Sequence, residues 1–398
     1  MPLWPFFVKR LYLDNHATTA VDPAVLEAML PYFSERYGNA SSKVHAFGQE
    51  AQAAVEGARE AVARLIGASA EEITFTSGAT ESNNLAIRGG ARSLSARGRH
   101  VVVSAIEHAS VLEPARTLER EGFTVTRVAV SADGIIDPAA VRDAVRTDTA
   151  LVSVMAANNE IGTVQPVAEI GALCRERGVV FHTDAVQALG RIPVDVRAWG
   201  ADVVSLSAHK MYGPKGVGAL YVSRERRPRV KPQPQSEGGG QEKGLRSGTL
   251  NVPGIVGLGK AAELAVAALV SDEPRRLAEL RDRLLTQLFA ALDGVTVNGS
   301  MTQRLPGNLN VSIERAEAET LILSLGGRIA LSSGAACAEA GGTGSHVLRA
   351  LGLSDPRIYT ALRFGIGRYN DQSDIEEVVE AVVTAARAAR ARSAPLLS

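Results

Sequence analysis

The chain has 398 residues, with 43 Lys and Arg balanced by 43 Asp and Glu. Its length predicts two domains, and its formal net charge of +0 gives no indication of a nucleic acid or an anionic membrane as a partner. The presence of only 2 cysteines excludes a disulfide framework and favours a reducing compartment. We find neither a signal-peptide pattern nor an uncharged apolar stretch of about 18 residues, and therefore predict a cytoplasmic protein without a membrane span.

Short apolar runs alternate with segments of helical periodicity through the first part of the chain. Glu50–Leu65, for example, has its apolar residues on one helical stripe. Apolar strands separated by helices predict an α/β fold with a parallel sheet that is covered on both faces, and such sheets bind ligands at the carboxyl ends of their strands. The predicted strands are Ile73–Thr76, Val101–Ser104, Val125–Val130, Leu151–Met155, Val179–Thr183 and Val203–Leu206.

The pattern changes after the glycine-rich stretch Gly238–Gly240. Ala261–Leu292 is predicted to be one long helical region, and short strands are predicted near Asn308–Ile313 and Arg363–Ile366. A last helix is predicted over Ile375–Arg392. We therefore expect a large domain at residues 12–261 and a smaller α+β domain at 262–398, with residues 1–15 packing against the smaller one.

Lys210 directly follows the predicted strand Val203–Leu206. A lysine at a strand end can direct its amine into a cleft, where burial or a neighbouring positive charge lowers its pKa and prepares it for Schiff-base formation. A surface lysine is the ordinary alternative. The stiff turn Tyr212–Gly216 that follows at once favours a covalent tether.

Asp184 ends another apolar run. A buried carboxylate needs a cationic partner or takes up a proton, and a protonated pyridine nitrogen would be such a partner. The alternative is an aspartate that caps a helix. Gln187 lies about one helical turn further on and could face the same pocket.

Three other polar segments follow predicted strands. Thr76–Asn84 includes Ala79 and Thr80 at an expected helix start, where backbone N–H groups favour an anion such as a phosphate, although a local capping box would use the same residues. His108 could stack on an aromatic ring or move protons, or be structural. Asn159 could bind a ring oxygen or a carboxylate, or form a turn.

The two cysteines differ in context. Cys174 lies at helical spacing with Val167, Ile170 and Leu173, which indicates a core position. Cys337 lies in a stretch of small residues that cannot build a packed face, as expected for an exposed, reactive thiol; the alternative is an incidental loop cysteine. Neither cysteine has a CxxC partner and the histidines do not pair at metal-ligand spacing, so we predict no metal site.

Taken together, the motifs from Tyr12–Thr19 to Arg363–Arg368 resemble the cysteine desulfurases of the NifS/IscS group. This is a class V branch of the enzymes that use pyridoxal 5'-phosphate (PLP) and share the PLP-dependent transferase fold type I. The resemblance implies a large domain with a mainly parallel sheet and a smaller α+β C-terminal domain. It also implies PLP as cofactor, L-cysteine as substrate, a homodimer, and a sulfur-acceptor protein such as an iron–sulfur scaffold.

The resemblance assigns roles residue by residue. Lys210 would carry PLP, Asp184 would pair with its pyridinium nitrogen, and Gln187 would bond its phenolic oxygen. Asn159 and Arg363 would bind the substrate carboxylate, Asn159 also lying against the cofactor. Cys337 would be the nucleophile that becomes a persulfide. The remaining roles are ring stacking and proton transfer by His108, and phosphate binding by Ala79, Thr80, Ser207, His209 and, from the second subunit, Thr249.

Other functions were weighed against this one. A different class V lyase or aminotransferase, acting for example on selenocysteine, fits less well because Cys337 lies in a long loop of small residues. A sulfur-carrier or adaptor protein would not need Lys210, Asp184 and His108 together. Lys243 stands where the group has arginine, and the segment after Ile375 does not resemble the tail with which other members dock a scaffold, so the acceptor is left open.

Overall fold

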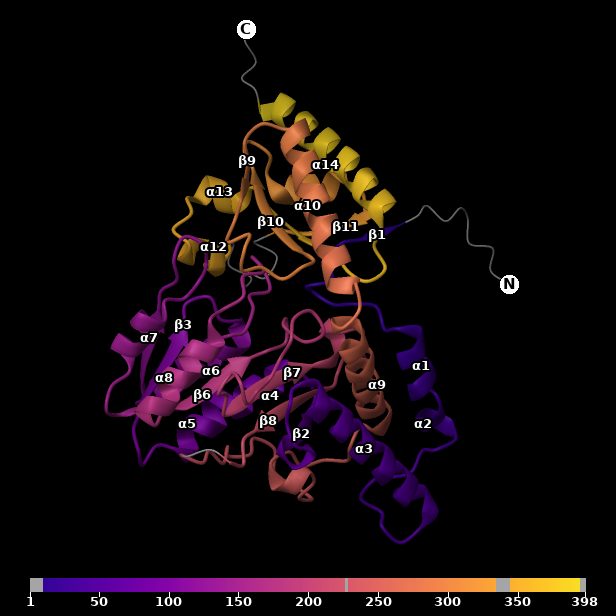
Figure 1. The fold of residues 1–398 in the computed structure, drawn as a ribbon, viewed down its shortest axis with the longest axis vertical. Coiled ribbons are helices and arrows are strands. Elements are labelled where there is room, and N and C mark those ends of the chain that lie inside the picture. The colour runs from indigo at the N-terminus through magenta and orange to yellow at the C-terminus, as the bar shows by residue number, and fades with distance from the viewer. Residues whose placement is uncertain (1–9, 226–227, 334–343, 394–398) are drawn as a thin grey trace.

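The computed structural model describes residues 10–225, 228–333 and 344–393. Its larger part is built on a seven-stranded sheet in the order β2-β8-β7-β6-β5-β3-β4 (Figure 1). From β7 to β4 all neighbours are parallel, whereas β8 is antiparallel to both β7 and β2. The strands are β2 (Ile73–Thr76), β3 (His100–Ser104), β4 (Thr124–Val128), β5 (Thr149–Ser153), β6 (Val180–Asp184), β7 (Val203–Ser207) and β8 (Gly218–Val222).

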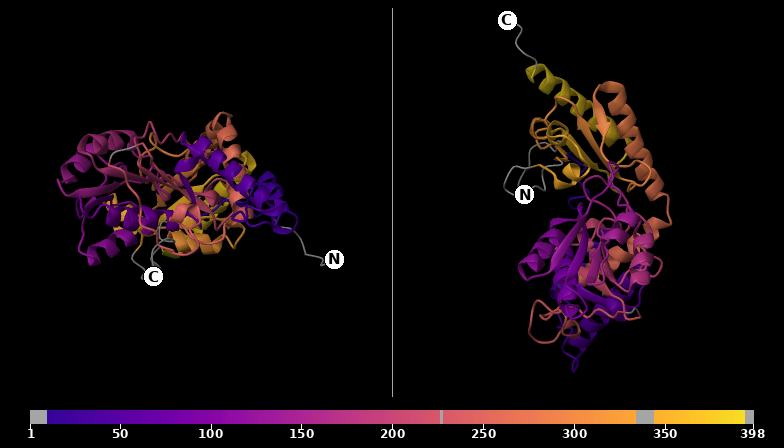
Figure 2. Two further views of the ribbon diagram at one scale, coloured as in Figure 1. Left: turned by 90° about the horizontal axis from the view of Figure 1, so that it is seen from below. Right: turned by 90° about the vertical axis from the view of Figure 1, so that its left-hand side faces the viewer.

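Helices cover both faces of this sheet, which confirms the predicted α/β class (Figure 2). Alternate residues of one strand enter opposite cores: Val102 packs in the core with α3, α7, α8 and α9, and Val101 and Val103 pack in the core with α5, α6 and the π-helical turn Leu85–Gly89. The helices of this part are α1 (Pro23–Met29), α2 (Pro31–Ser34), α3 (Ala46–Leu65), α4 (Ala79–Asn84), α5 (Gly90–Ser93), α6 (Ala109–Arg120), α7 (Pro138–Ala144), α8 (Val167–Arg177) and α9 (Val252–Leu269).

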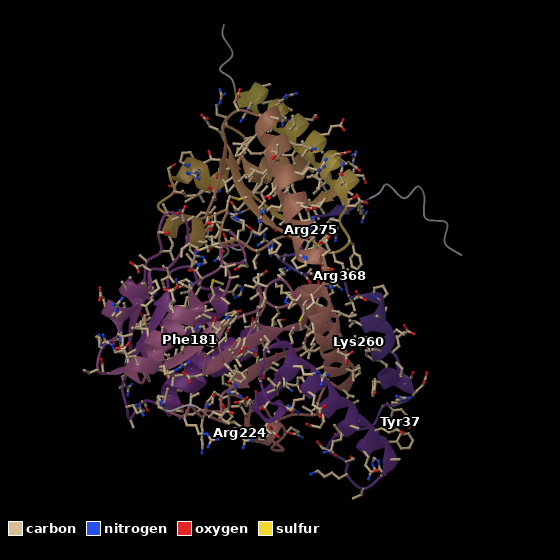
Figure 3. All side chains as sticks on the ribbon, viewed as in Figure 1. Tyr37, Phe181, Arg224, Lys260, Arg275 and Arg368 are labelled. Carbon is tan, nitrogen blue, oxygen red and sulfur yellow. The ribbon has the colours of Figure 1, made fainter. Side chains whose placement is uncertain are left out.

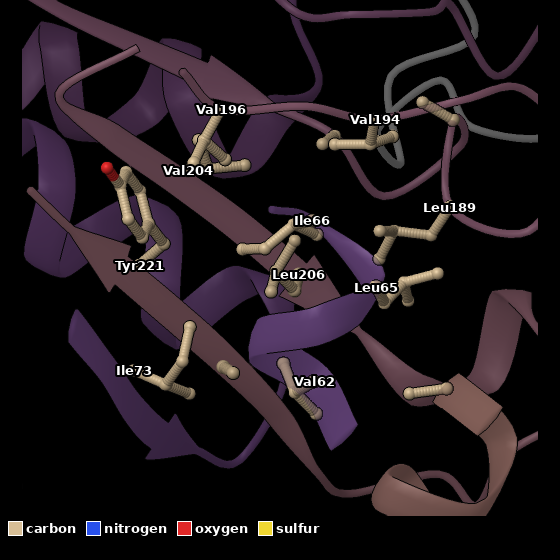
Figure 4. Packing of buried hydrophobic residues seen from close by; sticks show 14 of the residues in the cluster. Val62, Leu65, Ile66, Ile73, Leu189, Val194, Val196, Val204, Leu206 and Tyr221 are labelled. Atoms are coloured by element: carbon tan, nitrogen blue, oxygen red, sulfur yellow. The ribbon is translucent and has the colours of Figure 1, made fainter. Parts of the chain in front are cut away.

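Helix α9 is an apolar core helix. By length and composition it could cross a membrane, but its buried face packs in the same core as α3. The two helices approach closely at Gly259, where an added Cβ would lie 2.6 Å from the Cα of Ala58. Beside this contact, Val62 and Leu65 of α3 pack over the sheet (Figure 4).

The smaller part has its own antiparallel sheet, in the order β12-β13-β10-β9, and a separate core. The N-terminal strand β1 (Leu11–Tyr12) pairs in parallel with β11 (Ile329–Ala330), and Leu11 and Leu13 lie in this second core. The other elements are β9 (Val295–Val297), β10 (Asn308–Ile313), β12 (Ser332–Ser333), β13 (Ala361–Gly365), α10 (Glu273–Ala291), α11 (Ala318–Ser324), α12 (His346–Ala350), α13 (Asp355–Tyr359) and α14 (Gln372–Ser393).

The predicted helical region Ala261–Leu292 is two helices rather than one. α9 ends at Leu269 and α10 begins at Glu273, with Pro274 in its first turn. Proline lacks an N–H and restricts the residue before it, so it suits a helix start but not a helix interior. The predicted division at residues 261 and 262 falls inside α9, whose buried residues belong to the larger core, and we propose that the larger domain includes the whole of α9.

Candidate active site

A cavity of about 610 Å³ opens at the carboxyl ends of the parallel strands. Its walls come from residues that follow β2, β3, β5, β6 and β7, with His16–Thr18 and one residue of the smaller part. This is the edge at which such sheets bind ligands. The predicted residues that the fold brings together in its wall are Ala79, Thr80, His108, Asn159, Asp184, Gln187, Ser207, His209, Lys210 and Arg363.

Two predicted site residues are not in this wall. Thr249 is exposed and is not among the described residues that line the cavity. Cys337 lies outside the described residues. Cys174, by contrast, lies in α8 and is completely buried in the larger core, as its spacing predicts.

Asp184 ends β6 at the floor of the cavity and is buried. Its Oδ2 accepts a hydrogen bond from Asn83 Nδ2 at 2.7 Å, and its Oδ1 accepts from the Val186 N–H at 3.0 Å. The second bond closes a local turn, but no helix begins at Asp184 in the described part of the chain, so the alternative of a helix cap is wrong. The pairing of Asp184 with a cofactor stays a prediction. Within the described ranges Asp184 forms no salt bridge, which leaves its charge for a cation in the cavity, as a pyridinium nitrogen would be.

Lys210 lies in the 3₁₀ turn Ala208–Lys210 directly after β7. Its Nζ donates to the carbonyl oxygens of His16, at 2.7 Å, and Ala17. The chain then reverses at Tyr212, whose φ of 63° is an uncommon conformation for a side-chain-bearing residue. The amine is thus held in the cavity wall by a sharply bent segment, which fits a covalent tether.

Another part of the cavity wall carries groups that can bind an anion. Ser77, Gly78, Ala79 and Thr80 lead into α4, and Ser207 and His209 lie beside them in the same wall. Burial and the charge of Lys210 lower the pKa of His209 to about 4, so the imidazole is neutral at physiological pH. The alternative of a local cap over Ser77, Thr80 and Glu81 is found in part, because Glu81 accepts from the Ser77 N–H, although Gly78 stands at the N-cap of α4 and no side chain caps it there. The small residues and hydroxyl groups of this wall, together with a lysine such as Lys215, fit a phosphate group.

His108 caps the start of α6. Its Nδ1 accepts a hydrogen bond from the Ser110 N–H at 3.1 Å, and because a backbone N–H only donates, the neutral ring carries its hydrogen on Nε2. Burial lowers the pKa of His108, while the charge of Asp184 opposes that shift. Ser110 Oγ lies 2.7 Å from Nδ1 and also lines the cavity, so it offers a path for a proton to that nitrogen.

Arg363 of β13 is the residue that the smaller part contributes to the wall, and it is buried. Its Nη2 donates to Asp14 Oδ1 at 2.7 Å and to Ser332 Oγ at 2.9 Å, and its Nη1 donates to the Asn159 carbonyl oxygen at 3.1 Å. These contacts fix the plane of the guanidinium. A fixed guanidinium beside the Asn159 amide fits a carboxylate.

Several residues that hydrogen-bond to the side chains of the cavity wall were not predicted from the sequence. Asn83 binds Asp184 and Ser110, and Arg191 binds Gln187. Glu107 is buried next to His108, and burial raises the pKa of its carboxyl to about 8. The only signal in the sequence was an acidic residue directly after an apolar strand. The sequence pattern led to a predicted role for His108 but to none for Glu107.

An amine on a rigid turn, a carboxylate without a salt bridge and a phosphate cradle around one cavity define a PLP-dependent enzyme of fold type I. The family model for aminotransferase class V matches residues 11–378, and the chain belongs to that family. Within it, the chain belongs with the cysteine desulfurases. "Cysteine desulfurase IscS" of Anaeromyxobacter dehalogenans (strain 2CP-C) is 56% identical over 370 residues, which cover 93% of this chain and 90% of the relative.

More distant relatives agree. "Cysteine desulfurase, mitochondrial" of Arabidopsis thaliana is 50% identical over 375 residues, covering 94% of this chain and 82% of the relative. Among solved structures, a "NifS-like protein" matches with a TM-score of 0.87 and 38% identity over 94% of this chain and 98% of that one. "SspA in complex with cysteine" matches with a TM-score of 0.79 and 38% identity over 91% of this chain and 100% of that one.

Proposed function

We propose that this protein is a PLP-dependent cysteine desulfurase, which takes sulfur from L-cysteine, releases L-alanine and holds the sulfur as a persulfide on Cys337. The observation that carries the proposal is the single cavity in which Lys210, Asp184, His108 and Arg363 meet. The similarity to cysteine desulfurases along nearly the whole chain, and to a structure in complex with cysteine, supports the choice of substrate.

The residues that line the cavity have different roles in this reaction. Bound PLP supplies an electron sink that weakens the bonds at the substrate Cα. Lys210 carries the cofactor, Asp184 pairs with its ring nitrogen, and the phosphate lies against Thr80, Ser207 and His209. Arg363 and the Asn159 amide bind the substrate carboxylate and fix which bond faces the ring. His108 exchanges protons with the substrate, with Ser110 connected to its Nδ1.

The sulfur transfer itself belongs to Cys337. Its thiolate attacks the sulfur of L-cysteine, so that an S–S bond forms while the substrate C–S bond breaks. The electron pair of the broken bond stays with the substrate carbon, which takes up a proton and leaves as L-alanine. The persulfide then passes its outer sulfur to an acceptor protein, such as an iron–sulfur scaffold.

We further propose a cytoplasmic homodimer. Thr249 is exposed in its own chain and away from the cavity, as expected of a residue that completes the phosphate site of a second copy.

The two cysteines provide the test of the proposed nucleophile. Cys337→Ser should keep the visible absorbance of the bound cofactor but lose persulfide formation and sulfide release from L-cysteine. Cys174→Ala, which changes only a buried core residue, is the matched control and should keep both. Retained sulfide release in Cys337→Ser, or an equal loss in Cys174→Ala, would show that Cys337 is not the nucleophile.

A further inference from the structure

Arg191 lies directly behind Gln187, one helical turn further along the chain. Its Nη1 donates to Gln187 Oε1 at 2.9 Å and to the Gln187 carbonyl oxygen at 3.2 Å, and its Nη2 donates to the Asn15 carbonyl oxygen at 2.8 Å. Gln187 lines the cavity, whereas Arg191 does not. Among the cavity-lining side chains, the one to which the guanidinium hydrogen-bonds is Gln187.

His16 holds the same amide from the other side. His16 Nδ1 lies 2.9 Å from Gln187 Oε1, and Gln187 Nε2 donates to the His16 carbonyl oxygen at 3.0 Å. Burial, together with the charge of Arg191, lowers the pKa of His16 well below its ordinary value, so the ring is neutral and its hydrogen lies on Nδ1. The Arg191 guanidinium and the His16 Nδ1–H thus both donate to Gln187 Oε1.

These contacts fix which way the Gln187 amide points. A guanidinium has no acceptor, so the amide atom that faces Arg191 must be the oxygen. Turning the amide over would place its NH₂ group against the Arg191 guanidinium and its oxygen against the His16 carbonyl oxygen, so that neither contact could be a hydrogen bond. Gln187 is only 4% exposed, so water cannot replace those bonds.

The Gln187 nitrogen has two hydrogens, and among the described residues it has one acceptor, the His16 carbonyl. Its second N–H is available to the cavity. A cation bonded to the amide oxygen draws electrons from the nitrogen and strengthens that N–H as a donor. We propose that Arg191 is a positioning residue which, through Gln187, presents a strengthened N–H donor to the phenolic oxygen of the cofactor ring.

The consequence is a change in how the bound cofactor titrates. A hydrogen bond to the charged form of a group favours that form, so the donor keeps the phenolic oxygen deprotonated to lower pH. The visible band of the lysine-bound cofactor should then titrate at a lower pH than without Arg191. Arg191→Gln should raise the midpoint by roughly one pH unit. Arg191→Lys keeps the positive charge but loses the planar guanidinium with its two donor arms, so it should shift the midpoint less.

Arg276 offers a matched control. It is also half-buried and donates at 2.7 Å to two backbone carbonyls, those of Arg368 and Asn370, but it does not line the cavity. Arg276→Gln should therefore lower stability by a similar amount and leave the midpoint where it is. A midpoint in Arg191→Gln that equals that of Arg276→Gln would overturn the proposal.

A double-mutant cycle separates positioning from a bare charge effect. In a Gln187→Met background, Arg191→Gln should shift the midpoint by less than half as much as in the wild type, because the amide that transmits its effect is gone. An equal shift in both backgrounds would mean that Arg191 acts as a distant charge, and would overturn the positioning role. The readout is the cofactor spectrum, so the result does not depend on whether the enzyme desulfurates cysteine.

Discussion

At the scale of single residues, Glu107 shows how the site is supported by a group that is hard to ionise. Its side chain is fully buried, and its Oε1 accepts from Ser104 Oγ at 2.7 Å and from the Met155 N–H at 2.6 Å. Burial, and to a smaller degree the charge of Asp184, raises the pKa of the carboxyl to about 8. At neutral pH this carboxyl is therefore mostly protonated, next to His108, for which we propose proton exchange.

The raised pKa of Glu107 predicts a pH dependence of stability. In the unfolded chain a glutamate loses its proton near its ordinary pKa of about 4.3, whereas in the folded protein it keeps the proton up to about pH 8. The folded state thus binds more protons between these values, and the free energy of unfolding should fall by a few kcal/mol from pH 5 to pH 8. Glu107→Gln should flatten that fall in denaturant titrations, whereas Glu176→Gln on the surface of α8 should not.

Lys210 gives the simplest prediction for the cofactor. Lys210→Ala should abolish the visible absorbance that protein reconstituted with PLP shows, because it removes the amine that we propose as the tether. Lys215 lines the same cavity, so Lys215→Ala is the control and should keep the band. Equal loss in the two variants would contradict the assignment of Lys210.

The residues that the sequence predicted well are those that end strands. Asp184, His108 and Lys210 could be placed because the carboxyl ends of neighbouring parallel strands meet at one edge. Asn83 and Arg191 could not be found in this way. Asn83 contacts Asp184, 101 positions away, and Arg191 contacts Asn15, 176 positions away. A local pattern gives the type of a side chain but not its distant partner.

At the scale of elements, the contact between α3 and α9 depends on a missing side chain. Gly259→Ala would bring a methyl group within 2.6 Å of the Ala58 Cα, and backbone must shift to accept it. We expect a loss of about 1–3 kcal/mol in the free energy of unfolding. Gly57 of α3 has open space at its Cβ position, so Gly57→Ala should stabilise the holoenzyme by about 0.5–1 kcal/mol in the same denaturant titration. A destabilised Gly57→Ala would contradict this account.

Most elements follow from their apolar pattern. The predicted strands Ile73–Thr76 and Asn308–Ile313 agree with β2 and β10, in which polar and apolar residues alternate and all are buried. The reversed strand β8 was not predicted, because direction within a sheet is set by the connection and not by the run itself. The two-residue strands β1, β11 and β12 are too short for any periodicity.

At the scale of the whole molecule, an ion pair joins the two parts. Arg368 of the smaller part, labelled in Figure 3, donates at 3.0 Å to Asp22, which caps α1 of the larger part, and at 2.9 Å to Glu273 of its own part. The Arg368 guanidinium also lies 4.3 Å from the centre of the Tyr212 ring, close to the turn that holds Lys210. The position of the amine thus depends on how the two parts meet.

The proposed dimer can be tested by mixing subunits. Thr249→Ala should weaken PLP binding about tenfold, as expected for one lost bond to a phosphate. In a mixed dimer of Thr249→Ala and Lys210→Ala chains, the Lys210-bearing site receives an intact Thr249 from the other chain. Differently tagged mixed dimers should therefore show one site of wild-type affinity in a PLP titration, and its absence would place Thr249 in its own chain's site. Unchanged PLP affinity in the Thr249→Ala homodimer would place Thr249 in neither site.

The pairing of β1 with β11 sets an order of assembly. The partners of Leu11 and Tyr12, Ile329 and Ala330, are synthesised some three hundred positions after them, and Arg363, the partner of Asp14, later still. Contacts of such long sequence separation form slowly and only after the intervening chain exists. His16 and Ala17, whose carbonyls hold Lys210, follow directly on this strand. Cofactor capture is therefore a post-translational event, and nascent or truncated chains carry an unfinished pocket.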